Sequence, residues 1–269
     1  MVRVAVVQQS PREHLDATVA IHCELIGRAA DDGARLVVLP EGGLCGFARR
    51  HAEAMAAVQA LDGAYVEEIQ DLTSSLGIAV AAHVYEPARV GERPVAYNTV
   101  VVLDHGVLRR TYRKIHLFDA QSFCESAVVE PGDPGQLDEP PLDVDGIAVG
   151  VATCFDLRFG ELAVALARRG TVLLAVPAAW ASGPSKALQW DALLRARAIE
   201  TGCYVAGAAQ PGPAFSGGSV VYDPLGEQVG RALGPTGEGI VVVDVDARVT
   251  ARARSETPTL RHRPVWDAR

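Results

Sequence analysis

Three residues with chemically useful side chains each follow a predicted strand of this chain. Glu41 comes after the apolar run Leu-Val-Val-Leu-Pro, Lys114 closes a strand that ends in Thr-Tyr-Arg, and Cys154 follows a run rich in β-branched residues. A thiol, a carboxylate and an amine at strand ends can act as nucleophile, general base and electrostatic stabiliser. The combination therefore predicts nucleophilic catalysis by a cysteine.

The surroundings of the cysteine and the glutamate suggest how each is tuned. Phe-Asp-Leu-Arg after Cys154 predicts the start of a helix, whose N-terminus favours the thiolate. Glu41 is expected to be partly desolvated at a sheet edge, which raises the pKa of a carboxyl group and suits a base. Taken singly, each residue also has an ordinary interpretation: an inert buried thiol, a solvated loop carboxylate and a surface ammonium.

The three segments together resemble the nitrilase, or carbon–nitrogen hydrolase, superfamily. Its members carry a Glu after a Leu-Pro or Phe-Pro strand end, a Lys in Tyr-x-Lys-x-His-Leu, and a Cys followed by an aromatic residue and an Asp. The resemblance runs from Val-Ala-Val-Val-Gln near the start to Pro-Val-Trp near the end. It implies an α/β fold, a four-layer α-β-β-α sandwich of two packed mixed sheets, with no cofactor and no metal.

The resemblance also implies a mechanism. Cys154 attacks an amide carbonyl and forms a thioester acyl-enzyme, and Glu41 moves the thiol proton to the leaving ammonia. Lys114 stabilises the oxyanion, with the backbone N–H of Phe155 as a second donor. A fourth residue, Glu125 in Cys-Glu-Ser ahead of Pro-Gly, would orient the lysine; Glu130 is its competitor for that role.

Further residues are candidates for lining the substrate pocket. They are Phe118, Phe155, Trp180 and Arg158. Arg158 could bind a carboxylate of the substrate or form a structural ion pair with Asp156, and the sequence leaves both open.

The residues after the nucleophile, Cys-Phe-Asp-Leu-Arg-Phe, resemble the amidase branch that includes omega-amidases and deaminated glutathione amidases. This implies hydrolysis of the primary amide of a small carboxylate-bearing metabolite, such as deaminated glutathione or alpha-keto-glutaramate. The chain departs from the branch at Gly160, where a Pro is usual, and in lacking a His before Ser219. An N-carbamoyl amino acid amidohydrolase or a nitrilase with the same triad is the alternative. A catalytically silent binding protein of the same fold is another.

The amino-acid composition indicates which partners and metal sites can be expected for this protein. The 269 residues are 49% hydrophobic and carry a net charge of −8, which argues against nucleic acid and anionic membranes as partners. The five cysteines form no Cys-x-x-Cys pair, so neither zinc nor a disulfide framework is expected, and Cys45 and Cys124 are interpreted as packing residues. With no signal peptide or membrane span expected, we predict a cytoplasmic protein with a small-molecule amide substrate.

The elements that would position these groups alternate between strands and helices without a linker, which predicts one domain over residues 1–269. Helices are expected over residues 14–30, 52–59, 65–76, 161–169 and 187–201, with a β-hairpin turn at Asp104-His105-Gly106. Residues 115–140 show no clear periodicity, which in a compact domain often marks a functional segment. The Arg-rich tail, residues 248–269, is expected at a subunit interface of a homodimer or larger homo-oligomer rather than on nucleic acid.

Overall fold

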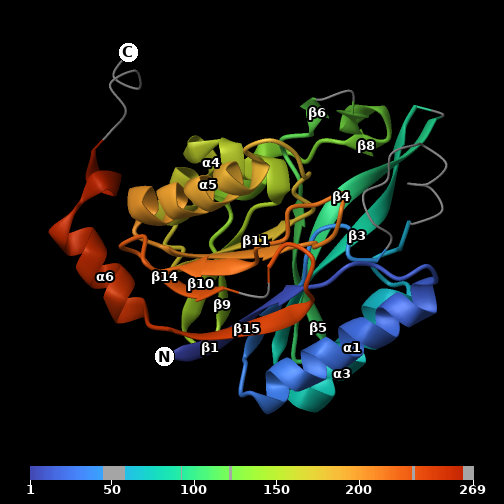
Figure 1. Ribbon diagram of the computed structural model, residues 1–269, viewed down its shortest axis with the longest axis horizontal. Coiled ribbons are helices and arrows are strands. Elements are labelled where there is room, and N and C mark those ends of the chain that lie inside the picture. Colours follow the sequence, from blue (N-terminus) through green and yellow to red (C-terminus); the bar gives the residue numbers. More distant parts are fainter. Residues whose placement is uncertain (45–57, 92, 121–122, 232–233, 263–269) are drawn as a thin grey trace.

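Two β-sheets pack face to face and form the centre of the molecule (Figure 1). The computed structural model describes residues 1–44, 58–91, 93–120, 123–231 and 234–262. The first sheet has seven strands in the order β15-β1-β2-β3-β4-β5, with β8 beside β4. Its strands are β1 (Val2–Gln8), β2 (Leu36–Val38), β3 (Ala79–Val90), β4 (Arg93–Asp104), β5 (Val107–Arg113), β8 (Val129–Glu130) and β15 (Gly239–Val245).

The second sheet has six strands in the order β14-β13-β12-β11-β10-β9. These are β9 (Leu142–Val144), β10 (Ile147–Val151), β11 (Leu173–Ala178), β12 (Tyr204–Ala209), β13 (Val220–Tyr222) and β14 (Gln228–Arg231). Both sheets are mixed: β1, β2 and β3 run parallel, as do β10, β11 and β12, and antiparallel strands flank each set. Parallel ladders of this kind need both faces covered.

Helices supply that cover on the outer face of each sheet (Figure 1). The first sheet carries α1 (Leu15–Asp31) and α3 (Ala64–Leu76), and the second carries α4 (Gly160–Arg168) and α5 (Lys186–Thr201). Three apolar clusters fill the spaces between successive layers, with Ile26, Val149 and Leu194 as a buried member of each. The predicted four-layer α-β-β-α sandwich is confirmed.

The local elements follow the sequence closely. The turn between β4 and β5 consists of His105 and Gly106, whose φ values of 49° and 79° are those of a type I′ hairpin. Helix α3 stops at Gly77, which adopts the left-handed conformation of a helix C-cap. Four of the five predicted helices are confirmed, and the fifth, residues 52–59, lies almost entirely outside the described residues, as does Cys45.

The structure shows short regular elements in two segments for which the sequence predicted none. Residues 115–140, expected to lack regular structure, contain the short strands β6 (Asp119–Ala120), β7 (Phe123–Cys124) and β8, and 3₁₀ turns at Glu125–Ala127 and Pro134–Asp138. The expected tail forms α6 (Ala247–Glu256) and a 3₁₀ turn at Thr259–Arg261. Its place at a subunit interface stays a prediction. Within the described residues, every helix is too short or too polar to cross a bilayer.

Candidate active site

The four predicted catalytic residues meet at one edge of the space between the two sheets. Glu41 follows β2 and Lys114 follows β5, both in the first sheet, and Glu125 begins the 3₁₀ turn before β8. Cys154 follows β10 of the second sheet. Glu41 and Lys114 are 0% exposed, Glu125 is 1% exposed and Cys154 is 7% exposed. The site is therefore built across the sheet-to-sheet contact and shielded from bulk water.

Lys114 is the centre of this cluster. Its Nζ donates to Glu41 Oε1 at 3.1 Å, and to Glu125 Oε2 at 2.8 Å and Oε1 at 3.1 Å. Burial alone would lower the pKa of this ammonium, but Glu125, Glu41 and Cys154 outweigh that effect and raise its pKa well above the ordinary value. The lysine is therefore a fixed positive charge.

The side chain and backbone of Glu41 are held by both sheets. Its Oε2 accepts the backbone N–H of Ala179 at 2.8 Å, its backbone carbonyl accepts Gln210 Nε2 at 2.6 Å, and the Cys154 thiol lies near enough to affect the pKa of its carboxyl group. Cys154, Ala179 and Gln210 follow β10, β11 and β12 respectively. Each of these three neighbouring parallel strands therefore places one residue after its carboxyl end beside Glu41.

The pKa of Glu41 moves in the direction opposite to the one expected from sequence. Burial raises it, but Lys114, His83, the Cys154 thiol and the Ala179 N–H together outweigh burial and hold it below the ordinary value. Glu41 is therefore an ionised carboxylate that can accept the thiol proton. The pKa of Glu125 is raised, because burial and the charge of Glu41 outweigh Lys114.

Cys154 adopts a backbone conformation unusual for a residue with a side chain. Its φ is 47°, in the left-handed region, at the first position of the 3₁₀ turn Cys154–Arg158. Strained backbone of this kind persists only where the surrounding structure enforces it, and it gathers at functional sites.

The expected thiolate at a helix N-terminus is wrong for the resting state. The turn has five residues, and burial together with the charge of Glu41 raises the pKa of the Cys154 thiol well above its ordinary value, although Lys114 opposes this. The sulfur therefore keeps its proton until a base removes it.

Glu125, rather than Glu130, is the second carboxylate on the lysine. Its Oε2 also accepts the backbone N–H of Phe118 at 2.6 Å, which fixes the segment before β6 to the cluster. Asn98 on β4 is a member that sequence reasoning missed: its Nδ2 donates to Glu41 Oε1 at 2.7 Å and to Glu125 Oε1 at 3.0 Å. The signal for Asn98 in the sequence was an amide side chain within an apolar strand. The structure shows that this amide is fully buried, where a polar group needs hydrogen-bond partners.

His83 packs beside this cluster on β3 and stays neutral. Burial lowers its pKa to about 4, and the charge of Lys114 adds to the effect while Glu41 opposes it. A neutral imidazole adds no second positive charge, so Lys114 remains the cation next to Glu41.

The four predicted pocket residues gather beside Cys154. The Phe118 and Phe155 rings meet edge to face with centroids 5.2 Å apart, and the Arg158 guanidinium lies 4.8 Å from the Trp180 ring centroid and 5.7 Å from that of Phe155. Arg158 Nη2 also donates to Gln189 Oε1 at 2.7 Å. These side chains form an aromatic wall that carries a guanidinium.

The alternative ion pair between Arg158 and Asp156 is not formed. The Asp156 carboxylate accepts the Tyr112 hydroxyl at 2.7 Å, the backbone N–H of Thr153 at 3.1 Å, and both the backbone N–H and Nδ1 of His116 at 2.9 and 2.8 Å. Asp156 therefore fixes the backbone on both sides of the nucleophile, and Arg158 is left with neutral partners.

Two smaller predictions have clear outcomes. Gly160, which replaces a usual Pro, begins α4, and an added Cβ would lie 3.1 Å from Arg197 Nη1, so this position adjoins α5. Cys124 is exposed, with its Sγ 3.4 Å from Ser126 Oγ, so its interpretation as a packing residue is wrong.

Comparisons with known proteins show the family to which the chain belongs. Residues 3–255 match the carbon-nitrogen hydrolase family. The chain is 36% identical over 278 residues to Hydrolase Rv0480c of Mycobacterium tuberculosis, with 97% of this chain and 95% of the relative covered. It is 32% identical over 243 residues to the deaminated glutathione amidase of Escherichia coli O157:H7, with 90% of each covered.

A solved structure is similar in fold. It is a mutant of the amidase from Nesterenkonia sp. AN1, showing the result of Michael addition of acrylamide at the active-site cysteine; it is 29% identical, with a TM-score of 0.76, and 95% of this chain and 98% of that chain are covered. The family match spans most of the chain, and full-length relatives exceed 30% identity. The chain belongs to the carbon–nitrogen hydrolase family, and it is an enzyme that hydrolyses carbon–nitrogen bonds of amides.

Proposed function

We propose that this enzyme hydrolyses the primary amide of a small carboxylate-bearing metabolite through a thioester on Cys154. The observation that carries the proposal is the place of Glu41: its carboxylate accepts a hydrogen bond from the Lys114 ammonium at 3.1 Å and its charge acts on the Cys154 thiol, with all three side chains buried. Nucleophile, base and cation are thereby in contact where water cannot screen them.

The proton inventory of the cluster supports the order of events. The thiol is protonated and Glu41 is ionised, so Glu41 takes the thiol proton as the sulfur attacks the amide carbonyl. Lys114 and the backbone N–H of Phe155 stabilise the oxyanion that forms. Glu41 then gives its proton to the departing nitrogen, the carbon–nitrogen bond breaks and ammonia leaves.

The second half of the reaction reuses the same base. A water molecule attacks the thioester and Glu41 accepts its proton; Glu41 then passes that proton to the sulfur as the carbon–sulfur bond breaks, which releases the carboxylic acid and restores the thiol. Glu125 keeps the ammonium of Lys114 in place through both halves, because it bonds that group with both oxygens. It is a positioning residue in this scheme.

The substrate class follows from the wall beside the nucleophile and from the relatives. Arg158 presents a guanidinium there without an acidic partner among the described residues, which suits a carboxylate of the substrate. A relative that matches 90% of the chain is named a deaminated glutathione amidase. Deaminated glutathione and alpha-keto-glutaramate are therefore the first substrates to try.

The test is ammonia release from a panel by the wild type, Cys154→Ala and Cys154→Ser. The panel contains those two amides, aliphatic amides, an N-carbamoyl amino acid and a nitrile. We expect turnover of the carboxylate-bearing amides that both variants lose. Carbon dioxide released with ammonia would show a carbamoylase, and acid formation from the nitrile without amide turnover would show a nitrilase. Equal turnover by the variants would overturn the mechanism.

A further inference from the structure

The chain contains two lysines among its 25 basic residues, and both lie at this site. Lys114 belongs to the catalytic cluster. Lys186 is the first residue of α5 and is 6% exposed, an unusual degree of burial for a lysine. Its position has no role in the mechanism above.

The lysine side chain reaches over the aromatic wall next to the nucleophile. Its Nζ lies 5.5 Å from the centroid of the Phe118 ring and 6.0 Å from that of the Trp180 ring. The Trp180 indole N–H donates to the backbone carbonyl of Lys186 at 2.9 Å, which fixes the start of α5 against the wall. Lys186 and Arg158 therefore share Trp180 as a common neighbour.

Neither cation has an anionic partner in the part of the chain that the structure describes. Arg158 bonds the neutral amide of Gln189, and no Asp or Glu side chain pairs with either residue there. Burial and the nearby Arg158 charge both lower the pKa of Lys186, while Cys154 raises it. Two like charges in a partly desolvated site repel each other, and an anion placed between them would relieve that repulsion.

We propose that Lys186 is a specificity-determining residue of this enzyme, and that with Arg158 it forms a two-cation subsite for a carboxylate of the amide substrate. The proposal rests on the proposed function and deepens it. Ammonia is the leaving group of a primary amide, so the anionic group must belong to the acyl part. The ring faces of Phe118 and Trp180 would flank the short aliphatic segment that joins that carboxylate to the amide.

Matched substrates separate the carboxylate from the rest of the molecule. Glutaramate and valeramide differ by a carboxylate against a methyl group at the end far from the amide, and succinamate and butyramide form a second such pair. Each is assayed for ammonia release with the wild type, Lys186→Met, Lys186→Arg and Arg28→Met. Arg28 is an exposed residue of α1, so its replacement removes one positive charge away from the site.

We expect Lys186→Met to raise KM for the carboxylate-bearing amides by about tenfold or more, because a desolvated charge pair with the substrate is lost. The kcat for these amides, and both parameters for valeramide and butyramide, should change little. Lys186→Arg should restore part of the preference, and Arg28→Met should behave as the wild type. An equal loss for charged and neutral amides, or no loss for either, would overturn the proposal.

A binding measurement keeps the subsite testable if the amides are not turned over. Calorimetric titration of Cys154→Ala with glutaramate and with valeramide, with and without Lys186→Met, reports recognition without chemistry. Weaker glutaramate binding in the double variant, with no ammonia released by the wild type, would retain the subsite and reject the proposed reaction. Equal binding of glutaramate with and without the lysine would reject the subsite whatever the turnover.

Discussion

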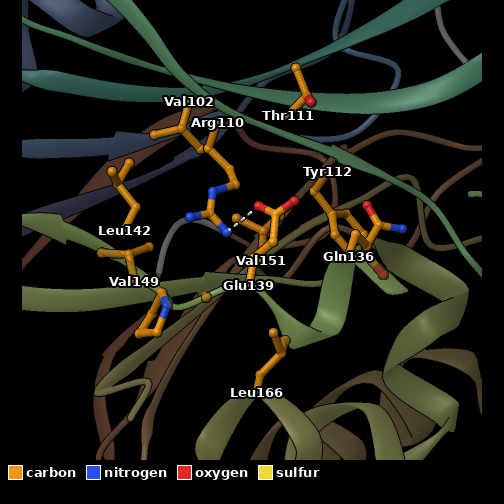
Figure 2. Close-up of a pocket in the computed structure, with 12 residues that line it drawn as sticks. Val102, Arg110, Thr111, Tyr112, Gln136, Glu139, Leu142, Val149, Val151 and Leu166 are labelled. Carbon is orange, nitrogen blue, oxygen red and sulfur yellow. Dashed lines mark ion pairs between the residues drawn. The ribbon is translucent and has the colours of Figure 1, made fainter. Parts of the chain in front are cut away.

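Two ion pairs whose cations lie close together in the sequence, Lys114 with Glu41 and Arg110 with Glu139, have the same nitrogen-to-oxygen distance of 3.1 Å. Their surroundings differ. The Lys114 and Glu41 side chains are 0% exposed, whereas those of Arg110 and Glu139 are 23% and 56% exposed. Figure 2 shows Arg110 and Glu139 reaching toward each other across a pocket whose walls include Val102, Val149 and Leu142 from both sheets.

The two pairs therefore differ in their exposure to solvent rather than in their nitrogen-to-oxygen distance. Water and salt screen the exposed pair, so its net contribution to stability is small. In the buried pair the two charges interact strongly. Removal of either one lowers the stability of the protein, because the other then remains buried without a partner. The residues that line the pocket of Figure 2 include no cysteine, whereas the charges of the buried pair act on the Cys154 thiol.

The largest expected effect comes from removing the cation of the buried pair. Lys114→Met should lower the free energy of unfolding by about 3–5 kcal/mol, because it leaves two buried carboxylates without their partner. It should also abolish amide turnover. Arg110→Met, the matched change in the exposed pair, should cost about 0–1 kcal/mol and leave turnover intact. Urea unfolding followed by tryptophan fluorescence, with ammonia release, measures both.

Replacing Glu41 by Gln tests separately its role as proton acceptor and the effect of its charge on the Cys154 thiol. Glu41→Gln should reduce amide turnover by about two to four orders of magnitude, since the proton acceptor is lost. The charge of Glu41 raises the pKa of the Cys154 thiol, so its removal should move the thiol titration to lower pH. In this variant the thiol should therefore ionise more readily, although amide turnover falls.

The pH dependence of iodoacetamide alkylation at Cys154, read by mass spectrometry, measures this titration. A Cys124→Ser background removes one exposed thiol that would react in parallel. Glu139→Gln, the corresponding change in the exposed pair, should alter neither turnover nor alkylation. A shift of the profile to higher pH in Glu41→Gln would contradict the electrostatic assignment.

A smaller loss is expected from the positioning carboxylate. Glu125→Gln keeps an oxygen for the Phe118 N–H but weakens the hold on Lys114, and a displaced cation should lower kcat by about a hundredfold. The thiol should remain reactive toward iodoacetamide, since Glu41 is unchanged. If kcat is unaltered, Glu125 has no part in positioning the lysine.

The smallest effect concerns salt. At roughly 1 M salt the screening length falls to about 3 Å, so the stability difference between the wild type and Arg110→Met should disappear. The difference for Lys114→Met should persist, because its partners are shielded by protein. Paired urea titrations at low and high salt give both differences.

The pattern of strands and helices alone predicted an α/β fold, and the family resemblance added the four layers and the candidate site residues, because the motifs that carry it are local. Glu41, Lys114 and Cys154 each sit at the end of a strand that its own residues define, and sheet geometry does the rest. Glu125 lies in a segment without clear periodicity, and the family motif Cys-Glu-Ser ahead of Pro-Gly identified it there. The cytoplasmic location, the single domain and the homodimer stay predictions.

What the sequence could not provide depends on contacts between distant segments. Asn98 is separated from Glu41 by 57 positions, and its role became visible when β4 was seen to carry the amide between both carboxylates. The pKa directions of Glu41 and Cys154 were also out of reach, because each is a balance of burial and charge that requires coordinates. Lys186 was overlooked because it directly precedes the helix predicted over residues 187–201, whereas the structure begins α5 at this residue.

The division of the site between the two sheets has a consequence for the nascent chain. Glu41, Asn98, Lys114 and Glu125 come from the half that is synthesised first, while Cys154 and the Ala179 and Gln210 donors to Glu41 come later. The first sheet is itself completed by β15, near the end of the chain. A partly made polypeptide therefore holds the proposed base, Glu41, without the proposed nucleophile, Cys154. Under the proposed mechanism, hydrolytic activity requires that both sheets are in place, so catalysis reports that the sandwich has closed.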